Sequence, residues 1–243
     1  MRTCWAAVLG KCGGGISGEH VLSKGLFRGK AVQVQGTPWK AEKLKPIGIN
    51  ALTANILCRD HNSALSNVDD EGIAAFHAIR RFEEVLAGRL NPINAADLQH
   101  HVSGHMLERW FIKHAINLFI VTGRERQWYD GSEAITPPRD IIEAVFGMHQ
   151  LRYPRGLYNW AGLKIGEQKV VSDQVAFVPI YNLANKYMGA SFEFQALSFL
   201  IWLDDKHLDS SGVPWPSIRD FYHHIGGFFD APPLRATFQV DWS

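Results

Sequence analysis

All three cysteines of this 243-residue chain lie in its first quarter, and this clustering constrains the fold more than any other feature of the sequence. Cys4 and Cys12 precede a run of three glycines, and Cys58 stands three residues before His61. Three thiolates and one imidazole form the ligand set of a tetrahedral structural zinc ion, and a Cys-x-x-His spacing lets two ligands reach one ion. The sequence therefore predicts that Cys4, Cys12, Cys58 and His61 bind one structural Zn²⁺.

The spacing and number of the cysteines leave one alternative. Seven residues separate Cys4 from Cys12, more than the roughly two to four usual between zinc ligands. The alternative is that the cysteines are free thiols packed as small apolar side chains. An odd number of cysteines, in a chain whose start lacks the apolar core of a signal peptide, argues against a disulfide framework. Because no segment approaches the ~18 apolar residues of a membrane span, we expect a cytoplasmic protein that contacts no membrane.

Three other polar residues of the same segment suit phosphodiester hydrolysis. Glu19 and His20 follow the glycines, and Asn62 follows His61 directly. A histidine, with an ordinary pKa of about 6.5, can take a proton from an attacking water at neutral pH. Carboxylate and amide oxygens bind Mg²⁺ or Mn²⁺ and leave positions open for water and a phosphate oxygen. The alternative for Glu19 and His20 is an ordinary surface pair at the end of a strand.

The order of these residues resembles a known family. Ser-x-Glu-His-Val occupies residues 17–21, a basic loop follows, and Ile-Leu-Cys-Arg-x-His-Asn occupies residues 56–62. Over residues 4–66 this arrangement is similar to the HNH endonucleases, whose zinc-bound domain has a ββα-metal fold. The resemblance covers no other part of the chain.

The resemblance implies a role for each residue of the motif. His20 matches the general base that activates a water, and Glu19 and Asn62 match the ligands of a catalytic Mg²⁺ or Mn²⁺. The zinc knuckle falls on Cys12, Cys58 and His61, with Cys4 as the fourth ligand.

The motif departs from the family at two places. The asparagine that orients the base histidine normally stands five residues before the third zinc ligand, where this chain has Thr53. Asn50 and Asn55 lie on either side, so either a local shift brings one of them into place or the orienting bond is made differently. His61 also replaces the usual fourth cysteine, which is chemically acceptable because imidazole binds zinc well.

Positive charge is concentrated near the start of the chain. Residues 1–68 hold nine Lys or Arg against three Asp or Glu, whereas the formal net charge of the whole chain is +1. The remainder is therefore net acidic. A basic region on a nearly neutral protein favours a partner that carries phosphates, and we expect nucleic acid, with DNA as the first choice. The alternative is a chance excess of charge on a solvated face.

The chain divides into three parts that together predict an α+β fold. We expect a zinc-supported ββα-metal module over residues 1–68, a helical region over 69–150 and a β-rich C-terminal lobe over 151–243. Apolar periodicity and turn residues predict the individual elements. The expected strands cover 32–35, 54–57, Lys169–Val178, Ala190–Leu203 and Ala236–Trp242. Two helices are expected to start close together, one near Asn62 or Ser63 and one at Asp69. Three further helices are expected from Asn94 or Asp97 to Thr122, from Asp140 to Met148 and from Ser217 to His224.

The helix that ends at Thr122 has apolar residues on more than one side, which predicts a buried central helix. His101, His105 and Glu108 would share one face of it. Such spacing can bind a metal, but exposed or capping histidines are the commoner explanation.

These observations favour a metal-dependent endonuclease that hydrolyses phosphodiester bonds of nucleic acid. The first alternative is a catalytically inactive zinc-knuckle module that binds nucleic acid or a protein partner. The second is a purely structural knuckle, with the function carried by residues 151–243. Residues 69–243 could select the substrate, form a homo-oligomer or bind a partner protein, and the sequence leaves these roles open.

Overall fold

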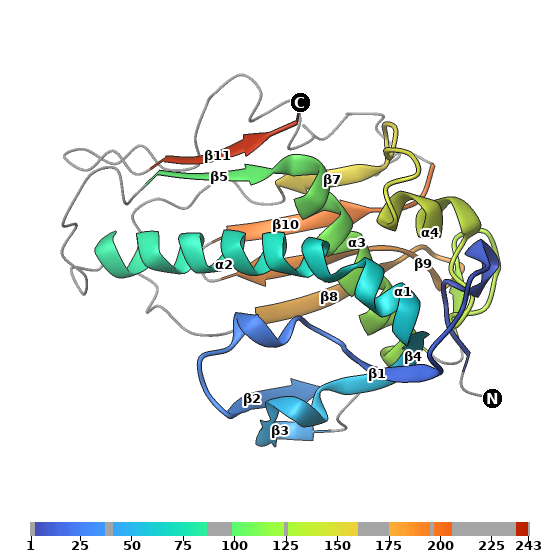
Figure 1. Cartoon of the computed structure of the whole chain (residues 1–243), viewed down its shortest axis with the longest axis horizontal. Coiled ribbons are helices and arrows are strands. Elements are labelled where there is room, and N and C mark those ends of the chain that lie inside the picture. Colours follow the sequence, from blue (N-terminus) through green and yellow to red (C-terminus); the bar gives the residue numbers. More distant parts are fainter. Residues whose placement is uncertain are drawn as a thin grey trace.

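The helix α3 (Gly104–Thr122) runs through the middle of the protein, and the other elements pack around it (Figure 1). Almost every side chain from Leu107 to Ile120 is buried, which confirms the expected central helix. Ser103 caps its first turn, because Ser103 Oγ accepts a hydrogen bond from the backbone N–H of Met106 at 3.3 Å.

The computed structural model describes residues 3–36, 41–86, 99–123, 126–159, 175–194, 197–205 and 237–242. In chain order its α-helices are α1 (Arg59–Ala64), α2 (Ser66–Leu86), α3 (Gly104–Thr122) and α4 (Arg139–Val145). Its strands are β1 (Ile16–His20), β2 (Ala31–Gly36), β3 (Ala41–Gly48), β4 (Thr53–Cys58), β5 (Gln99–Ser103), β6 (Gln127–Trp128), β7 (Gly156–Asn159), β8 (Val175–Tyr181), β9 (Lys186–Phe194), β10 (Leu197–Trp202) and β11 (Thr237–Asp241). Short 3₁₀ helices are η1 (Ala7–Leu9), η2 (Lys24–Leu26) and η3 (Ile49–Ala51).

In the N-terminal part, two antiparallel strands lead directly into a short helix. β1 pairs with β4, and α1 begins at the residue after β4. The strand expected over 54–57 is confirmed as β4. The helix begins earlier than the expected Asn62 or Ser63, because Cys58 Sγ accepts the backbone N–H of His61 at 3.5 Å and so caps the first turn.

A second pair of strands in this part forms a separate ribbon. β2 and β3 are antiparallel, with Val32 opposite Ile47 and Val34 opposite Lys45. The strand expected over 32–35 is therefore confirmed as part of β2. Figure 1 places this ribbon near β1 and β4, at the edge of the molecule.

The helix expected from Asp69 is confirmed as α2, which begins slightly earlier, at Ser66. Its residues Ala75, Ile79 and Phe82 are buried, so the apolar repeat at three- and four-residue steps forms the face that contacts the core. The helix expected over Asp140–Met148 is α4, which ends at Val145.

The expected start of the central helix is wrong. Residues 94 and 97 lie outside the described residues, but Gln99–Ser103 form strand β5, which pairs in parallel with β11 near the C-terminus. α3 begins only at Gly104, where a Cβ would lie 2.3 Å from the ring of Trp242. Pairing with a distant strand overrides the local helical pattern. His101 therefore lies on a strand and does not share a helix face with His105 and Glu108.

The C-terminal part is mainly a sheet with the order β6-β9-β10-β7, in which β8 also pairs with β9. The strand expected over Ala190–Leu203 is instead two antiparallel strands, β9 and β10, with Phe194 opposite Leu197. β8 covers the described end of the expected strand Lys169–Val178, and β11 matches the one expected over Ala236–Trp242. The helix expected over Ser217–His224 lies outside the described residues.

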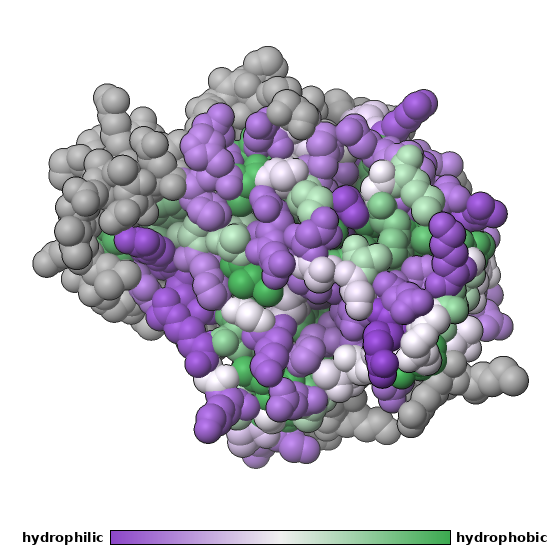
Figure 2. Space-filling view, viewed as in Figure 1, coloured by the Kyte–Doolittle hydropathy of each residue, from purple (hydrophilic) through white to green (hydrophobic). Residues whose placement is uncertain are grey.

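One continuous hydrophobic cluster draws residues from all three parts of the chain, including Leu57, Phe119 and Ile201, each fully buried. Helices and strands both line this core, which confirms an α+β fold at that level of detail. Within the described residues, no helix combines the length and the apolar character needed to cross a membrane. The face seen in Figure 2 is mostly hydrophilic, with hydrophobic residues scattered between hydrophilic ones.

Candidate metal centre

The four predicted zinc ligands meet at one place although they come from three segments. Cys4 precedes η1, Cys12 lies in the following loop, Cys58 ends β4, and His61 lies on the first turn of α1. Close packing of the loop requires glycine at Gly14, which has a φ of +67° and lies where a Cβ would be 2.8 Å from the side chain of Arg59. The loop therefore closes directly against the start of α1.

The geometry of the cluster fits a metal ion. His61 Nδ1 lies 3.4 Å from Cys4 Sγ, 3.6 Å from Cys12 Sγ and 3.1 Å from Cys58 Sγ. All four ligand atoms lie within 4.8 Å of one another. Tetrahedral zinc, with bonds of about 2.3 Å to sulfur and about 2.0 Å to nitrogen, separates these ligand atoms by ~3.5 Å. The group could therefore hold a metal ion, and its donor set suits zinc.

The chemistry of the four side chains favours a shared cation over free thiols. A single imidazole nitrogen has one lone pair and can accept a hydrogen bond from only one S–H group, yet three sulfurs surround His61 Nδ1. Burial raises the pKa of the Cys4 thiol to about 12, so a thiolate at this position needs a nearby positive charge. Burial lowers the pKa of His61, which favours the neutral imidazole that binds metals.

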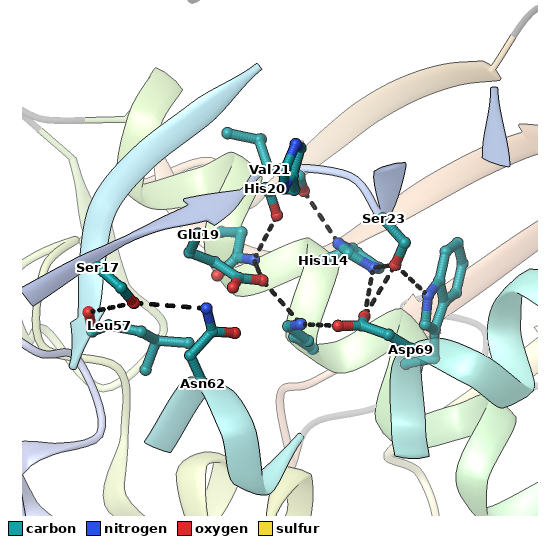
Figure 3. A network of polar contacts seen from close by, with 12 residues as sticks. Ser17, Glu19, His20, Val21, Ser23, Leu57, Asn62, Asp69 and His114 are labelled. Carbon is teal, nitrogen blue, oxygen red and sulfur yellow. Dashed lines mark hydrogen bonds and ion pairs between the residues drawn. The ribbon is translucent and has the colours of Figure 1, made fainter. Parts of the chain in front are cut away.

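A network of polar contacts lies beside this centre (Figure 3). Asn62, the residue after His61, donates from Nδ2 to Ser17 Oγ at 3.4 Å, and Ser17 Oγ donates to Leu57 O. Because Leu57 O can only accept, the Ser17 hydroxyl proton is committed to it and Ser17 Oγ accepts from the amide nitrogen of Asn62. Asn62 Oδ1 therefore points away from Ser17, and no described residue donates to it.

Figure 3 shows the side chains of Glu19 and Ser17 on the same side of β1, although the pairing with β4 shifts register between these two residues. Its carboxylate is buried, with Oε1 2.7 Å from Lys113 Nζ and 3.4 Å from Asn117 Nδ2. Both contacts use Oε1, and among the described residues none makes a hydrogen bond to Oε2. The structure thus brings Glu19 and Asn62 to the same side of β1, each with one oxygen available.

Lys113 links Glu19 to a second carboxylate. Its fully buried ammonium lies 2.6 Å from Asp69 Oδ2, so one positive charge stands between two negative ones. Burial alone would raise the pKa of Asp69, but the hydrogen bond from His114 and the charge of Lys113 hold it well below its ordinary range. Asp69 is therefore ionised at neutral pH.

The network continues from Asp69 to the end of β1. Ser23 Oγ donates to Asp69 Oδ1 at 2.8 Å and accepts from Trp110 Nε1 at 2.9 Å. His114 Nε2 lies 2.9 Å from Ser23 Oγ, and His114 Nδ1 donates to Val21 O at 2.9 Å. α3 thus holds the chain that continues from β1.

His20 occupies the opposite face of β1 from Glu19, because consecutive residues on a strand point to opposite faces (Figure 3). Its Nε2 atom is shielded from solvent and makes no hydrogen bond to any described residue. Burial lowers the pKa of His20, so the neutral imidazole is favoured. The structure does not place His20 on the side where Glu19 and Asn62 meet.

Among the described residues, no hydrogen bond joins the side chain of Asn50 or Asn55 to His20. Thr53 is directly opposite His20 in the ladder, and Asn50 and Asn55 are exposed. Instead Asn117 of α3 donates from Nδ2 to His20 O at 3.4 Å. This contact reaches the backbone of His20 and not its imidazole.

Lys113, His114 and Asn117 were not predicted from the sequence as site residues, nor was Asp69. A signal for three of them was present, because Lys, His and Asn interrupt the apolar helix between Ile112 and Leu118. Polar residues at such positions are buried with partners or are functional. The identity of their partners, far away in the sequence, could not be read from that pattern.

Comparison of this chain with family models, with curated proteins and with solved structures finds no match. The resemblance to HNH endonucleases therefore rests on the sequence motifs within residues 4–66 alone.

Proposed function

We propose that this protein is a metal-dependent endonuclease that hydrolyses phosphodiester bonds of nucleic acid, with DNA as the first choice. One observation carries the proposal: Asn62 Oδ1 and Glu19 Oε2, two oxygens without a protein partner among the described residues, lie on the same side of β1 beside the metal centre. Hard divalent cations take such oxygen ligands. The order β1, β4, α1 is the one expected of a ββα-metal module.

In this proposal the cysteine-histidine centre has a structural role. Four protein ligands fill the coordination sphere of zinc, so no position is left for substrate. Cys4, Cys12, Cys58 and His61 would then fix the loop before β1 to the β4–α1 junction. This keeps Asn62 close to the strand that carries Glu19.

Glu19 and Asn62 would hold the catalytic Mg²⁺ or Mn²⁺, which would neutralise charge on the phosphate and on the leaving oxygen. Lys113 and Asn117 both contact Glu19 Oε1, so Glu19 would offer Oε2 alone. A site with two protein oxygens leaves room for water and for a phosphate oxygen.

His20 is the proposed general base. It would accept a proton from the attacking water at Nε2 while the oxygen of that water bonds to phosphorus, the P–O bond to the leaving oxygen breaks, and the leaving oxygen takes a proton from solvent. Because Nε2 is shielded from solvent in this structure, this role requires the side chains around it to move aside. What supports this role is a neutral imidazole whose Nε2 has no partner among the described residues. Because Glu19 and His20 point to opposite faces, a phosphate that meets both must lie across the end of β1.

The nucleic acid would contact exposed basic side chains of the N-terminal part. Those within the described residues that are solvent-exposed include Lys24, Lys30, Lys43, Lys45 and Arg59. Arg2 and Lys40 lie outside the described residues. Positive side chains near the ribbon β2–β3 and the metal centre would bind phosphates independently of base sequence.

A second candidate function has an observation of its own. Lys113 already supplies a positive charge to Glu19, at 2.7 Å, which reduces the need for a metal cation there. This favours a catalytically inactive zinc module that binds nucleic acid or a protein partner.

The experiment that decides between them is incubation of purified protein with plasmid DNA and with RNA, in Mg²⁺, in Mn²⁺ and in chelator. The nuclease should cut only with a divalent cation, and His20→Ala, purified in the same way, should not. His149→Ala, which changes an exposed histidine beyond α4, is the matched control and should cut like the parent. If the parent cuts neither substrate with any divalent cation, the endonuclease proposal fails and the binding module remains.

A further inference from the structure

α3 reaches three consecutive residues at the end of β1. Lys113 pairs with the carboxylate of Glu19, and His114 donates to the backbone carbonyl of Val21. Between them, Asn117 reaches the backbone carbonyl of His20 itself. The proposed catalytic strand is therefore held by a helix that lies outside the motif.

Asn117 is fully buried, and each of its polar atoms has a partner. Asn117 Oδ1 accepts from Trp5 Nε1 at 3.2 Å, and Asn117 Nδ2 lies 3.4 Å from both Glu19 Oε1 and His20 O. An indole N–H can only donate, and a carboxylate or carbonyl oxygen can only accept. The orientation of the amide is therefore fixed by its partners, with the oxygen toward Trp5 and the nitrogen toward β1.

We propose that Asn117 is a positioning residue of the nuclease site, which fixes the backbone at His20 and the rotamer of Glu19 together. The proposal rests on the proposed function, because it assigns Asn117 a part in that reaction. Asn117 would not touch the substrate. It would act through His20 and Glu19, whose side chains leave the strand in opposite directions and cannot both be aligned unless the backbone between them is held.

The chemistry of the position favours an amide over other side chains. Aspartate would turn an acceptor toward Glu19 Oε1 and His20 O, where two donors are needed. An apolar side chain would leave Trp5 Nε1 and His20 O without this partner, and a buried polar group that loses its hydrogen bond destabilises the fold. Asn117 also ties this strand to Trp5, the neighbour of the metal ligand Cys4.

The test uses the full-length protein with three substitutions, Asn117→Ser, Asn117→Asp and Asn55→Ala. Asn55 is exposed on β4 and is the matched control for loss of an asparagine near His20. For each protein, kcat and KM are measured on a DNA substrate at saturating Mg²⁺, together with zinc content and hydrogen exchange of residues 19–21. Misplacement of a catalytic group by about 1 Å can cost ~10²-fold in rate. We expect kcat to fall by ~10- to 100-fold for both Asn117 variants, with KM and zinc content little changed.

Hydrogen exchange provides a readout that does not depend on activity. Residues 19–21 should exchange faster in Asn117→Ser than in the parent and in Asn55→Ala. Equal exchange in all three proteins would overturn the proposal, because it would show that Asn117 does not hold the strand.

The remaining outcomes separate this inference from the proposed function. If the parent cuts DNA and folded, zinc-loaded Asn117 variants cut equally fast, Asn117 has no positioning role and the nuclease assignment stands. If both variants lose zinc or fail to fold, Asn117 serves the fold alone and the inference is overturned. A loss of rate in Asn55→Ala as large as in the Asn117 variants would also overturn it. A parent that cuts nothing removes the proposed function and the inference together.

Discussion

The ammonium of Lys113 lies 2.7 Å from Glu19 Oε1, and both side chains are buried. The charge of Lys113 is shared with Asp69 at 2.6 Å, which belongs to α2 rather than to β1. Removing one partner of a buried ion pair leaves an uncompensated charge and is strongly destabilising. Lys113 therefore joins β1, α2 and α3 through a single side chain.

Lys113→Met should lower the free energy of unfolding by ~3–5 kcal/mol, because Glu19 and Asp69 would remain as two buried carboxylates without their shared cation. Denaturant unfolding measures this. Arg139→Met, which breaks an exposed ion pair with Glu143, is the control and should cost at most about 0.5 kcal/mol. Adding Glu19→Gln to Lys113→Met should restore part of the loss. Equal stability of Lys113→Met and the parent would contradict this account.

The low pKa of Asp69 predicts how stability depends on pH. In the unfolded chain the pKa of Asp69 is about 3.9, and in the folded protein it is lower. Above pH 3.9 the ionised carboxylate therefore stabilises the folded state, and this contribution is lost as the pH falls toward the pKa of the folded state. The difference in unfolding free energy between the parent and Asp69→Asn should be constant from about pH 7 to 5 and should shrink below about pH 4. The cysteine-histidine cluster is the same in both proteins, so any effect of acid on the cluster cancels in the difference between their unfolding free energies. A difference that grows on acidification would have the wrong sign.

Cys58→Ser should release the metal and destabilise the N-terminal part, because metal binding contributes directly to folding free energy. Cys58 caps α1 as well as lying 3.1 Å from His61 Nδ1. Serine can keep the helix cap, so this change removes the sulfur ligand alone. Elemental analysis of the parent should find about one zinc per chain. A parent that folds normally without any bound metal would rule out this structural role.

The three proposed catalytic residues should fail in two different ways. His20→Ala should lose the ~10²–10⁴-fold that a general base supplies, and excess Mg²⁺ should not restore it. Glu19→Gln and Asn62→Ala should weaken metal binding, so a Mg²⁺ titration should recover part of their rate. Cleavage time courses across that titration, with zinc content checked in each variant, distinguish the two classes. Recovery of His20→Ala by Mg²⁺ would remove His20 from the role of base.

Affinity for duplex DNA should fall steeply as salt rises, because contacts between Lys or Arg and phosphates release counterions. Replacing Lys43 and Lys45 of β3 together by Ala should reduce the slope of log affinity against log salt by up to ~2. Binding titrations at several salt concentrations measure this, with Lys186→Ala, on β9, as a control. Binding that is insensitive to salt would exclude the basic region as the contact surface.

Local signals were sufficient for part of the fold. The alternation around Val32 and Val34 corresponds to β2, where Val34 is buried and Val32 half-buried between exposed glutamines. The repeat Ala75, Ile79, Phe82 corresponds to α2, which buries these residues in the main hydrophobic core. The Cys-x-x-His spacing likewise identified ligands that do gather at one point. In each case the physical cause lies within a few residues of the pattern.

Long-range pairing explains what was missed. β5 exists because His100 and Val102 pair with Phe238 and Val240, residues that a local window never sees together. The same holds for Lys113, whose partners Glu19 and Asp69 lie on two other elements. Periodicity could indicate that α3 is buried, but not which charges would neutralise the lysine inside it.

The contact between Asn117 and Glu19 joins residues 98 positions apart, whereas the cysteine-histidine cluster that could hold a metal is already complete at His61. On a ribosome, all four residues of this cluster are therefore synthesised before α3. In that interval Glu19 has neither its cation nor its amide, and β1 is not yet held. Metal capture can precede alignment of the proposed reacting groups, which separates maturation of this protein into two successive events.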